Sequence, residues 1–82
     1  MIWIVGRGIY ALNYIRFLGK NVNLITTDKY DFAGFTKYVK QVYFVNFDEK
    51  YCLNIEKLVK NDIVVAIGEE TLYLDEYIKK TG

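Results

Sequence analysis

The chain has 82 residues, of which 52% are hydrophobic, 17% aromatic and 26% charged, and this composition predicts one small globular domain over residues 1–82. Eleven basic and ten acidic residues leave a net charge of +1, which argues against a nucleic-acid-binding protein. With no histidine and one cysteine, Cys52, the sequence excludes an intrachain disulfide, histidine acid–base catalysis and the usual transition-metal sites.

The hydrophobic segments are short and are interrupted by polar residues. None approaches the ~20 residues that a transmembrane helix needs. The N-terminus also lacks the charged-then-apolar layout of a secretory signal. We therefore expect a cytoplasmic protein that does not enter a membrane.

The first part of the chain predicts a strand, a glycine turn and a helix. Residues 2–5 are apolar and run into Gly6-Arg7-Gly8, after which residues 9–18 have the pattern of a helix. Gly19 follows this helix at the position where a positive φ is favoured. A second strand is expected at residues 22–26, with Asp28 close to its carboxyl end.

The middle of the chain predicts a weak helix, a strand and a strong helix. Asp31 is expected to cap a short helix over residues 32–39, which Gly34 weakens. A third strand is predicted at residues 42–45. Asp48 is then expected to cap a helix over residues 51–59, whose apolar residues, Cys52 among them, share one face. Without a histidine to activate it, Cys52 is predicted to be a buried structural residue.

The last part of the chain predicts a buried strand and an acidic helix start. Residues 63–67 form a continuous apolar run, which is typical of a central strand covered on both faces. Gly68 ends the run, and a helix over residues 69–80 begins with Glu69 and Glu70. Acidic residues are favoured in any first helical turn, so these two glutamates are either helix-stabilising or substrate-contacting residues.

Alternating strands and helices with short connections predict a small open Rossmann-like α/β sheet of about four parallel strands, with helices on both faces and the first strand inside. Ligands of such sheets bind outside the carboxyl ends of the strands. The sequence places three segments at that edge: Gly6 to Gly8, Thr27 with Asp28, and Gly68 to Glu70. We expect these segments to converge.

Gly6, Gly8 and Ala11 match the dinucleotide-binding pattern G-x-G-x-x-(G/A), and Asp28 stands near the place of the acidic residue that contacts the ribose. This pattern indicates a site for NAD or an adenine nucleotide. In the alternative interpretation the glycines only allow a tight turn and Asp28 is a solvated loop residue. Arg7 either adds a contact to an anion or points into water.

Read together, the segments resemble the N-terminal, pre-ATP-grasp domain of ATP-grasp ligases such as the large chain of carbamoyl-phosphate synthase, over nearly the whole chain. The resemblance is carried by the order and spacing of six features. They are the glycine turn after the first strand, Asp28 after the second, the stretch from Phe35 to Val45, the helix from Tyr51 to Val59, the Asp62-Ile63-Val64-Val65 strand and the acidic turn from Gly68 to Leu72. The Asn46-Phe47 pair stands where many members of the family carry a proline.

The resemblance implies a domain that shapes the pocket for a small carboxylate or amine substrate. Its implied substrate-binding residues are Gly6, Arg7, Gly8, Glu69 and Glu70. It implies no cofactor in this chain, because ATP and magnesium are held by the two later domains of such ligases. The isolated chain is therefore expected to be inactive, and its implied partners are those ATP-grasp domains or a separate catalytic subunit.

The first predicted helix carries aromatic residues on a second face, at Tyr10, Tyr14 and Phe17. Either these side chains lie along the surface or they form an interface with a second copy or with the rest of a ligase. The sequence thus leaves three functions open: a ligase domain, a small regulatory nucleotide-binding module and a structural dimerisation domain.

Overall fold

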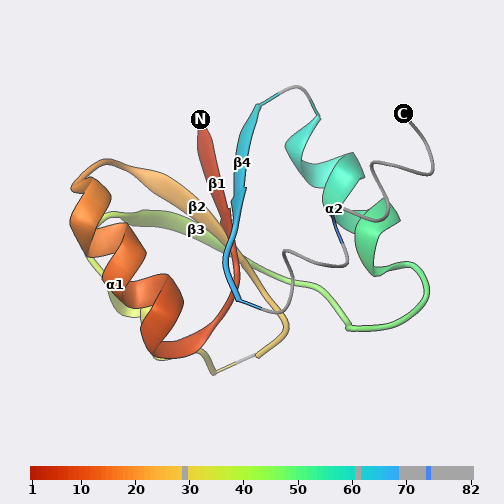
Figure 1. Cartoon of the computed structure of the whole chain (residues 1–82), viewed down its shortest axis with the longest axis horizontal. Coiled ribbons are helices and arrows are strands. Elements are labelled where there is room, and N and C mark those ends of the chain that lie inside the picture. The colour runs from red at the N-terminus through yellow and green to blue at the C-terminus, as the bar shows by residue number, and fades with distance from the viewer. Residues whose placement is uncertain (29, 61, 69–73, 75–82) are drawn as a thin grey trace.

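The computed structural model describes residues 1–28, 30–60, 62–68 and 74, which contain a four-stranded parallel sheet between two helical layers (Figure 1). The strands are β1 (Ile2–Val5), β2 (Val22–Thr26), β3 (Val39–Phe44) and β4 (Ile63–Ala66), in the order β3-β2-β1-β4. The helices are α1 (Gly8–Leu18), α2 (Tyr51–Val59) and the short 3-10 helix η1 (Phe32–Phe35). The predicted α/β fold and the interior position of β1 are confirmed.

The strands alternate their side chains between two hydrophobic layers. Figure 1 shows α1 and α2 on opposite faces of the sheet, so one layer lies under each helix. The layer under α1 consists of Ile4, Ala11, Leu12, Ile15, Val22, Leu24 and Ala33. The layer under α2 consists of Trp3, Val5, Ile25, Val45, Tyr51, Ile55, Val59 and Leu74. Burying a large aliphatic side chain contributes about 1.5–3 kcal/mol, so these layers hold the helices on the sheet.

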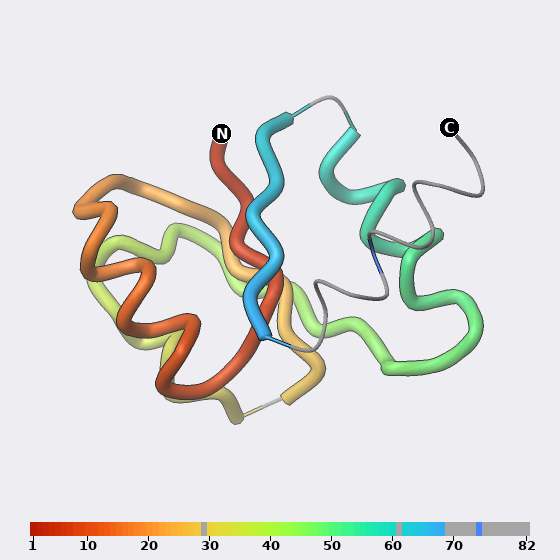
Figure 2. The backbone as a smooth tube through the Cα atoms, in the orientation of Figure 1, coloured from red at the N-terminus to blue at the C-terminus, as the bar shows by residue number. Residues whose placement is uncertain are grey.

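The carboxyl end of α1 lies where the sequence predicts it. Gly19 has the left-handed φ of 61° that was expected after the helix, and its N–H donates to the carbonyl oxygen of Ile15. The chain then enters β2, which pairs in parallel with β1 from Ile2 opposite Val22 to Val5 opposite Ile25. Figure 2 shows the longer crossover, in which the chain leaves β3 at one edge of the sheet and returns through α2 to β4 at the other.

The helix predicted over residues 32–39 is wrong beyond Phe35. Only η1 forms, with the Asp31 side chain accepting from the Ala33 N–H as a cap, and β3 begins at Val39 instead of residue 42. A tertiary contact explains the change, because a Cβ on Gly34 would lie only 2.8 Å from Cγ2 of Val42. The segment packs onto β3 at this close approach, and strand pairing competes with helix propagation.

The prediction of a central strand at residues 63–67 is also wrong. Within the described sheet β4 pairs only with β1 and lies at an edge, and Ile63 is 67% exposed. A continuous apolar run indicates a strand without charged residues. It does not indicate whether the strand pairs with another strand on one side or on both.

The helix α2 is confirmed, with Tyr51, Ile55 and Val59 buried on one face. Asp48 does not cap it directly, because its carboxylate accepts from the Lys50 N–H at 2.9 Å, one residue before the helix. The predicted helix over residues 69–80 lies outside the described residues apart from Leu74. In the described part of the chain, no helix has the length and apolar character of a membrane span.

Candidate functional site

The glycine turn after β1 lies against the end of β4 at the carboxyl edge of the sheet. The Ile67 N–H donates to the carbonyl oxygen of Val5 at 2.8 Å, and the Gly6 N–H donates to that of Ile25 at 3.1 Å. A Cβ on Gly6 would stand 3.1 Å from the Ile67 carbonyl oxygen, which is tighter than ordinary contacts allow. Glycine at this position therefore lets the turns after β1 and β4 come together, as the sequence predicts.

Arg7 and Gly8 connect the glycine turn to α1. Arg7 is exposed and extended at the helix N-cap position, and its side chain makes no capping hydrogen bond. Gly8 has a φ of +68°, a conformation that costs other residues roughly 1–2 kcal/mol. The first turn of α1 contains no acidic residue. The positive end of this helix is therefore without a local negative partner in the sequence.

Asp31 supplies that negative partner from a distant part of the chain. Both of its carboxylate oxygens lie 3.2 Å from the Gly8 nitrogen, and the side chain also accepts from the Thr26 hydroxyl at 2.9 Å and the Ala33 N–H at 3.0 Å. Asp31 is only 4% exposed. Hydrogen bonds to an ionised carboxylate are stronger than neutral ones, so this cluster fixes η1 against the amino end of α1.

Thr26 connects this cluster to the loop that follows β2. Thr26 is 2% exposed, and its hydroxyl donates to Asp31 and accepts from the Asp28 N–H at 3.1 Å. The Asp28 carboxylate is exposed and accepts from the Tyr30 N–H at 3.0 Å. Asp28, which the sequence offered as a ribose contact, thus shapes the loop, and Asp31 occupies the position next to the glycine turn.

The arrangement has a direct chemical consequence for the glycine turn. In nucleotide-binding turns of this type the phosphate sits at the helix amino end, where backbone N–H groups and the helix dipole attract it. Here a buried carboxylate already accepts from the first of these N–H groups. A phosphate brought to the same point would meet a like charge across a short distance. The sequence indicates Asp31 only as the cap of the next helix, and no local pattern indicates its contact with Gly8.

The structure describes three of the five substrate-binding residues that the sequence predicts. Gly6, Arg7 and Gly8 lie together at the carboxyl edge, where Gly6 approaches Ile67. Glu69 and Glu70 lie outside the described residues. Among the residues described, no three His, Cys, Asp or Glu side chains are grouped as metal ligands would be. The exposed Arg7 guanidinium is suited to an anionic group of a small molecule.

The aromatic face of α1 is largely exposed. Tyr10 is 73% and Phe17 85% exposed, whereas Tyr14 is half-buried with its ring centroid 6.5 Å from that of Phe17. Cys52, predicted to be buried, is half-buried on α2, and desolvation by burial raises the pKa of its thiol. A raised pKa favours the neutral thiol, which is a weaker nucleophile than the thiolate.

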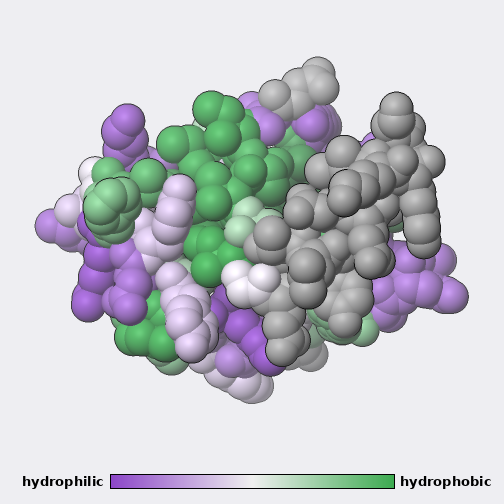
Figure 3. All heavy atoms as spheres, viewed as in Figure 1, coloured by the Kyte–Doolittle hydropathy of each residue, from purple (hydrophilic) through white to green (hydrophobic). Residues whose placement is uncertain are grey.

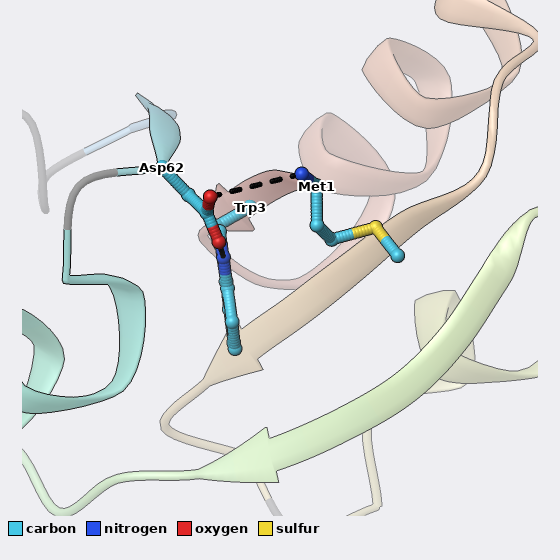
Figure 4. A network of polar contacts seen from close by, with 3 residues as sticks. All are labelled: Met1, Trp3 and Asp62. Atoms are coloured by element: carbon cyan, nitrogen blue, oxygen red, sulfur yellow. Dashed lines mark hydrogen bonds and ion pairs between the residues drawn. The ribbon is translucent and has the colours of Figure 1, made fainter.

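A second polar cluster lies at the opposite, amino edge of the sheet (Figure 4). The Trp3 indole N–H donates to Oδ2 of Asp62 at 2.9 Å, and the Met1 ammonium lies 3.8 Å from Oδ1 of the same carboxylate. Asp62 precedes β4, and Trp3 belongs to β1. The aspartate that contributed to the family resemblance therefore ties these two strands together, away from the glycine turn.

The chain was compared with protein families, curated proteins and solved structures. No protein-family model, curated protein or solved structure matches the chain at a significant level.

Proposed function

We propose that the chain is the substrate-side domain of an ATP-dependent carboxylate–amine or carboxylate–ammonia ligase of the ATP-grasp type, similar to the domain that opens the large chain of carbamoyl-phosphate synthase. In this function the carboxyl edge of the sheet forms one wall of a small-molecule pocket. ATP and magnesium are held by other domains or by a separate subunit, and the chain alone does not catalyse the reaction.

The observation that carries this proposal is the Asp31 carboxylate at the amino end of α1, 3.2 Å from the Gly8 nitrogen. It favours the ligase function over an NAD-binding or adenine-nucleotide-binding module, because such a module needs that position for phosphate. With an internal anion in place, the glycine turn would serve as a wall of the pocket and not as a phosphate site. The close approach of Gly6 to Ile67 supports the same function by aligning the turns after β1 and β4.

The proposed division of work among the side chains follows from their chemistry. Arg7 is exposed on the turn, and its guanidinium would pair with a substrate carboxylate through two parallel hydrogen bonds. Gly6 and Gly8 would shape the wall beside the substrate, since Gly6 allows the close approach of Ile67 and Gly8 has the positive φ that the turn needs. Glu69 and Glu70 remain proposed contacts for an amine or ammonium group, since a carboxylate is the natural partner of such a group.

A ligand panel tests the proposal. The thermal unfolding midpoint of the chain should stay unchanged with NAD and should rise little or not at all with ATP or ADP. The chain alone should release no phosphate from ATP when carboxylates and ammonia are supplied. A clear, saturable rise with NAD alone would overturn the ligase proposal in favour of the nucleotide-binding module.

The protein that supplies the ATP-binding part gives a second test. Its sequence, in the same reading frame or in a separate subunit, should contain a glycine-rich loop with a lysine followed by paired carboxylates. A reconstituted pair should release phosphate from ATP, and Arg7→Ala should raise the KM for the carboxylate more than it lowers kcat. Arg16→Ala is the matched control, because Arg16 is an exposed arginine in the last turn of α1, away from the glycine turn.

A further inference from the structure

The α1 side of the sheet is covered unevenly. The register places Ile63 beside Ile2 and Val65 beside Ile4, so alternate residues of β4 face the same side as the core under α1. Val65 is only half-buried, and Ile63 is 67% exposed. The apolar surface of the sheet thus continues past the helix that covers it.

One flank of α1 borders this uncovered strip. Tyr10, Tyr14 and Phe17 follow the i, i+4, i+7 spacing that places residues on one side of a helix. Tyr14, Val65 and Ile67 are all half-buried and pack against the core cluster under α1. We call this combined surface the α1–β4 face. It consists of Ile2, Tyr10, Tyr14, Phe17, Ile63, Val65 and Ile67.

Figure 3 shows a band of hydrophobic side chains over β4, beside the side chains of α1. Single exposed apolar residues are normal on a protein surface, but a continuous apolar surface that joins a helix flank to a sheet face marks an interaction site. This surface needs no part of the glycine turn, so the inference is independent of the ligase proposal.

We propose that the α1–β4 face pairs with the same face of a second copy of this chain across a two-fold axis. The charges favour this occupant. All members of the face are uncharged, and a two-fold axis brings a surface against itself, so like charges do not oppose the pairing. The net charge of +1 adds little long-range repulsion between two copies.

The exposed residues of the face supply part of the area that a stable dimer buries. An aromatic side chain has about 150–250 Å² of surface, so Tyr10 and Phe17, 73% and 85% exposed, together offer about 300 Å². A standard interface buries about 800 Å² on each partner. The two rings supply more than a third of that area, and Ile63 and the half-buried residues of the face add to it.

Sedimentation velocity over a range of micromolar concentrations tests the proposal. The wild-type chain should sediment with twice the 9.6 kDa of one copy and should dissociate on dilution. Phe17→Glu and Ile63→Gln alter the face on two different elements. Each should raise the dimer dissociation constant at least about tenfold, as the loss of a central contact does.

Phe35→Glu is the matched control, because Phe35 is 87% exposed, close to the 85% of Phe17, but lies on η1 outside the face. It should leave the dimer intact. Far-UV circular dichroism checks that every variant folds. If Phe17→Glu does not fold, the dissociation constant of the Ile63→Gln dimer tests the face instead. A wild-type chain that stays monomeric throughout, or a loss of dimer with Phe35→Glu equal to that with Phe17→Glu, would overturn the proposal.

Discussion

Asp31 places both carboxylate oxygens 3.2 Å from the backbone nitrogen of Gly8, although the two residues are 23 positions apart. The amino end of α1 is therefore neutralised by an acid from the loop after β2 and not by a residue of its own first turn. This contact joins the glycine turn, β2 and η1 into one unit. It also places a carboxylate where nucleotide-binding turns hold a phosphate.

Replacing Asp31 with alanine should lower the free energy of unfolding by about 2–4 kcal/mol, because hydrogen bonds to a charged group contribute about 1.5–3 kcal/mol each. Urea unfolding followed by circular dichroism measures this loss. Asp28→Ala is the control, since the Asp28 carboxylate is exposed, and it should cost less than about 1 kcal/mol.

The Asp31→Ala variant should also respond to anions in solution. With the carboxylate gone, the amino end of α1 attracts phosphate or sulfate, so these ions should raise the unfolding midpoint of the variant more than that of the wild type. Chloride at matched ionic strength separates this effect from general salt stabilisation. An equal response of both proteins would show that the carboxylate does not occupy an anion position.

Gly34→Ala should destabilise the chain by about 1–3 kcal/mol, the usual cost of overpacking. The cause is local, because the new Cβ would lie 2.8 Å from Cγ2 of Val42. Val42→Ala removes that methyl group, so Gly34→Ala should cost much less in the Val42→Ala background. Unfolding energies of the four proteins give the coupling, and additive costs would contradict this explanation of the short η1.

Asp62→Ala should lower the free energy of unfolding by about 1–3 kcal/mol, since it leaves the indole N–H of Trp3, a residue only 6% exposed, without its partner. Trp3 is the one tryptophan in the sequence, so its fluorescence reports the change directly. The exposed Asp48 provides the control, and Asp48→Ala should leave the emission unchanged. An unaltered spectrum in Asp62→Ala would contradict the tie between β1 and β4.

Burial raises the pKa of the Cys52 thiol in the folded chain, so folding favours the neutral form. The associated stability is present below the unfolded pKa of about 8.5 and is lost as the pH rises through the folded pKa. Relative to Cys52→Ser, the wild type should therefore lose stability above pH ~8.5. At pH 8, a thiol reagent should react more slowly with the folded chain than with the urea-unfolded chain. Equal rates would contradict the effect of burial.

Local patterns predicted much of the fold, and tertiary contacts explain where they failed. The helix period in α2 and the glycine after α1 act within a few residues, so both could be predicted. The end of η1 depends on a contact between Gly34 and Val42, which no local pattern records. The edge position of β4 depends on strand order, and an apolar run does not encode that order.

The candidate site, like the fold, could be predicted only in part from the sequence. The convergence of Gly6 with the turn after β4 follows from parallel topology and could be predicted. Asp31 and Asp28 are near neighbours in the sequence, and nothing local indicates which of them turns inward. Only the absence of an acid in the first turn of α1 could have suggested that an aspartate from elsewhere fills that position.

Calorimetric titration of the wild-type chain with NAD tests the central claim most directly, with Asp31→Ala titrated in parallel. An internal carboxylate at the amino end of α1 predicts no saturable heat with the wild type. Saturable binding of NAD by the wild-type chain, abolished by Gly8→Asp, would contradict the account, because it would place the phosphates at the position that Asp31 fills.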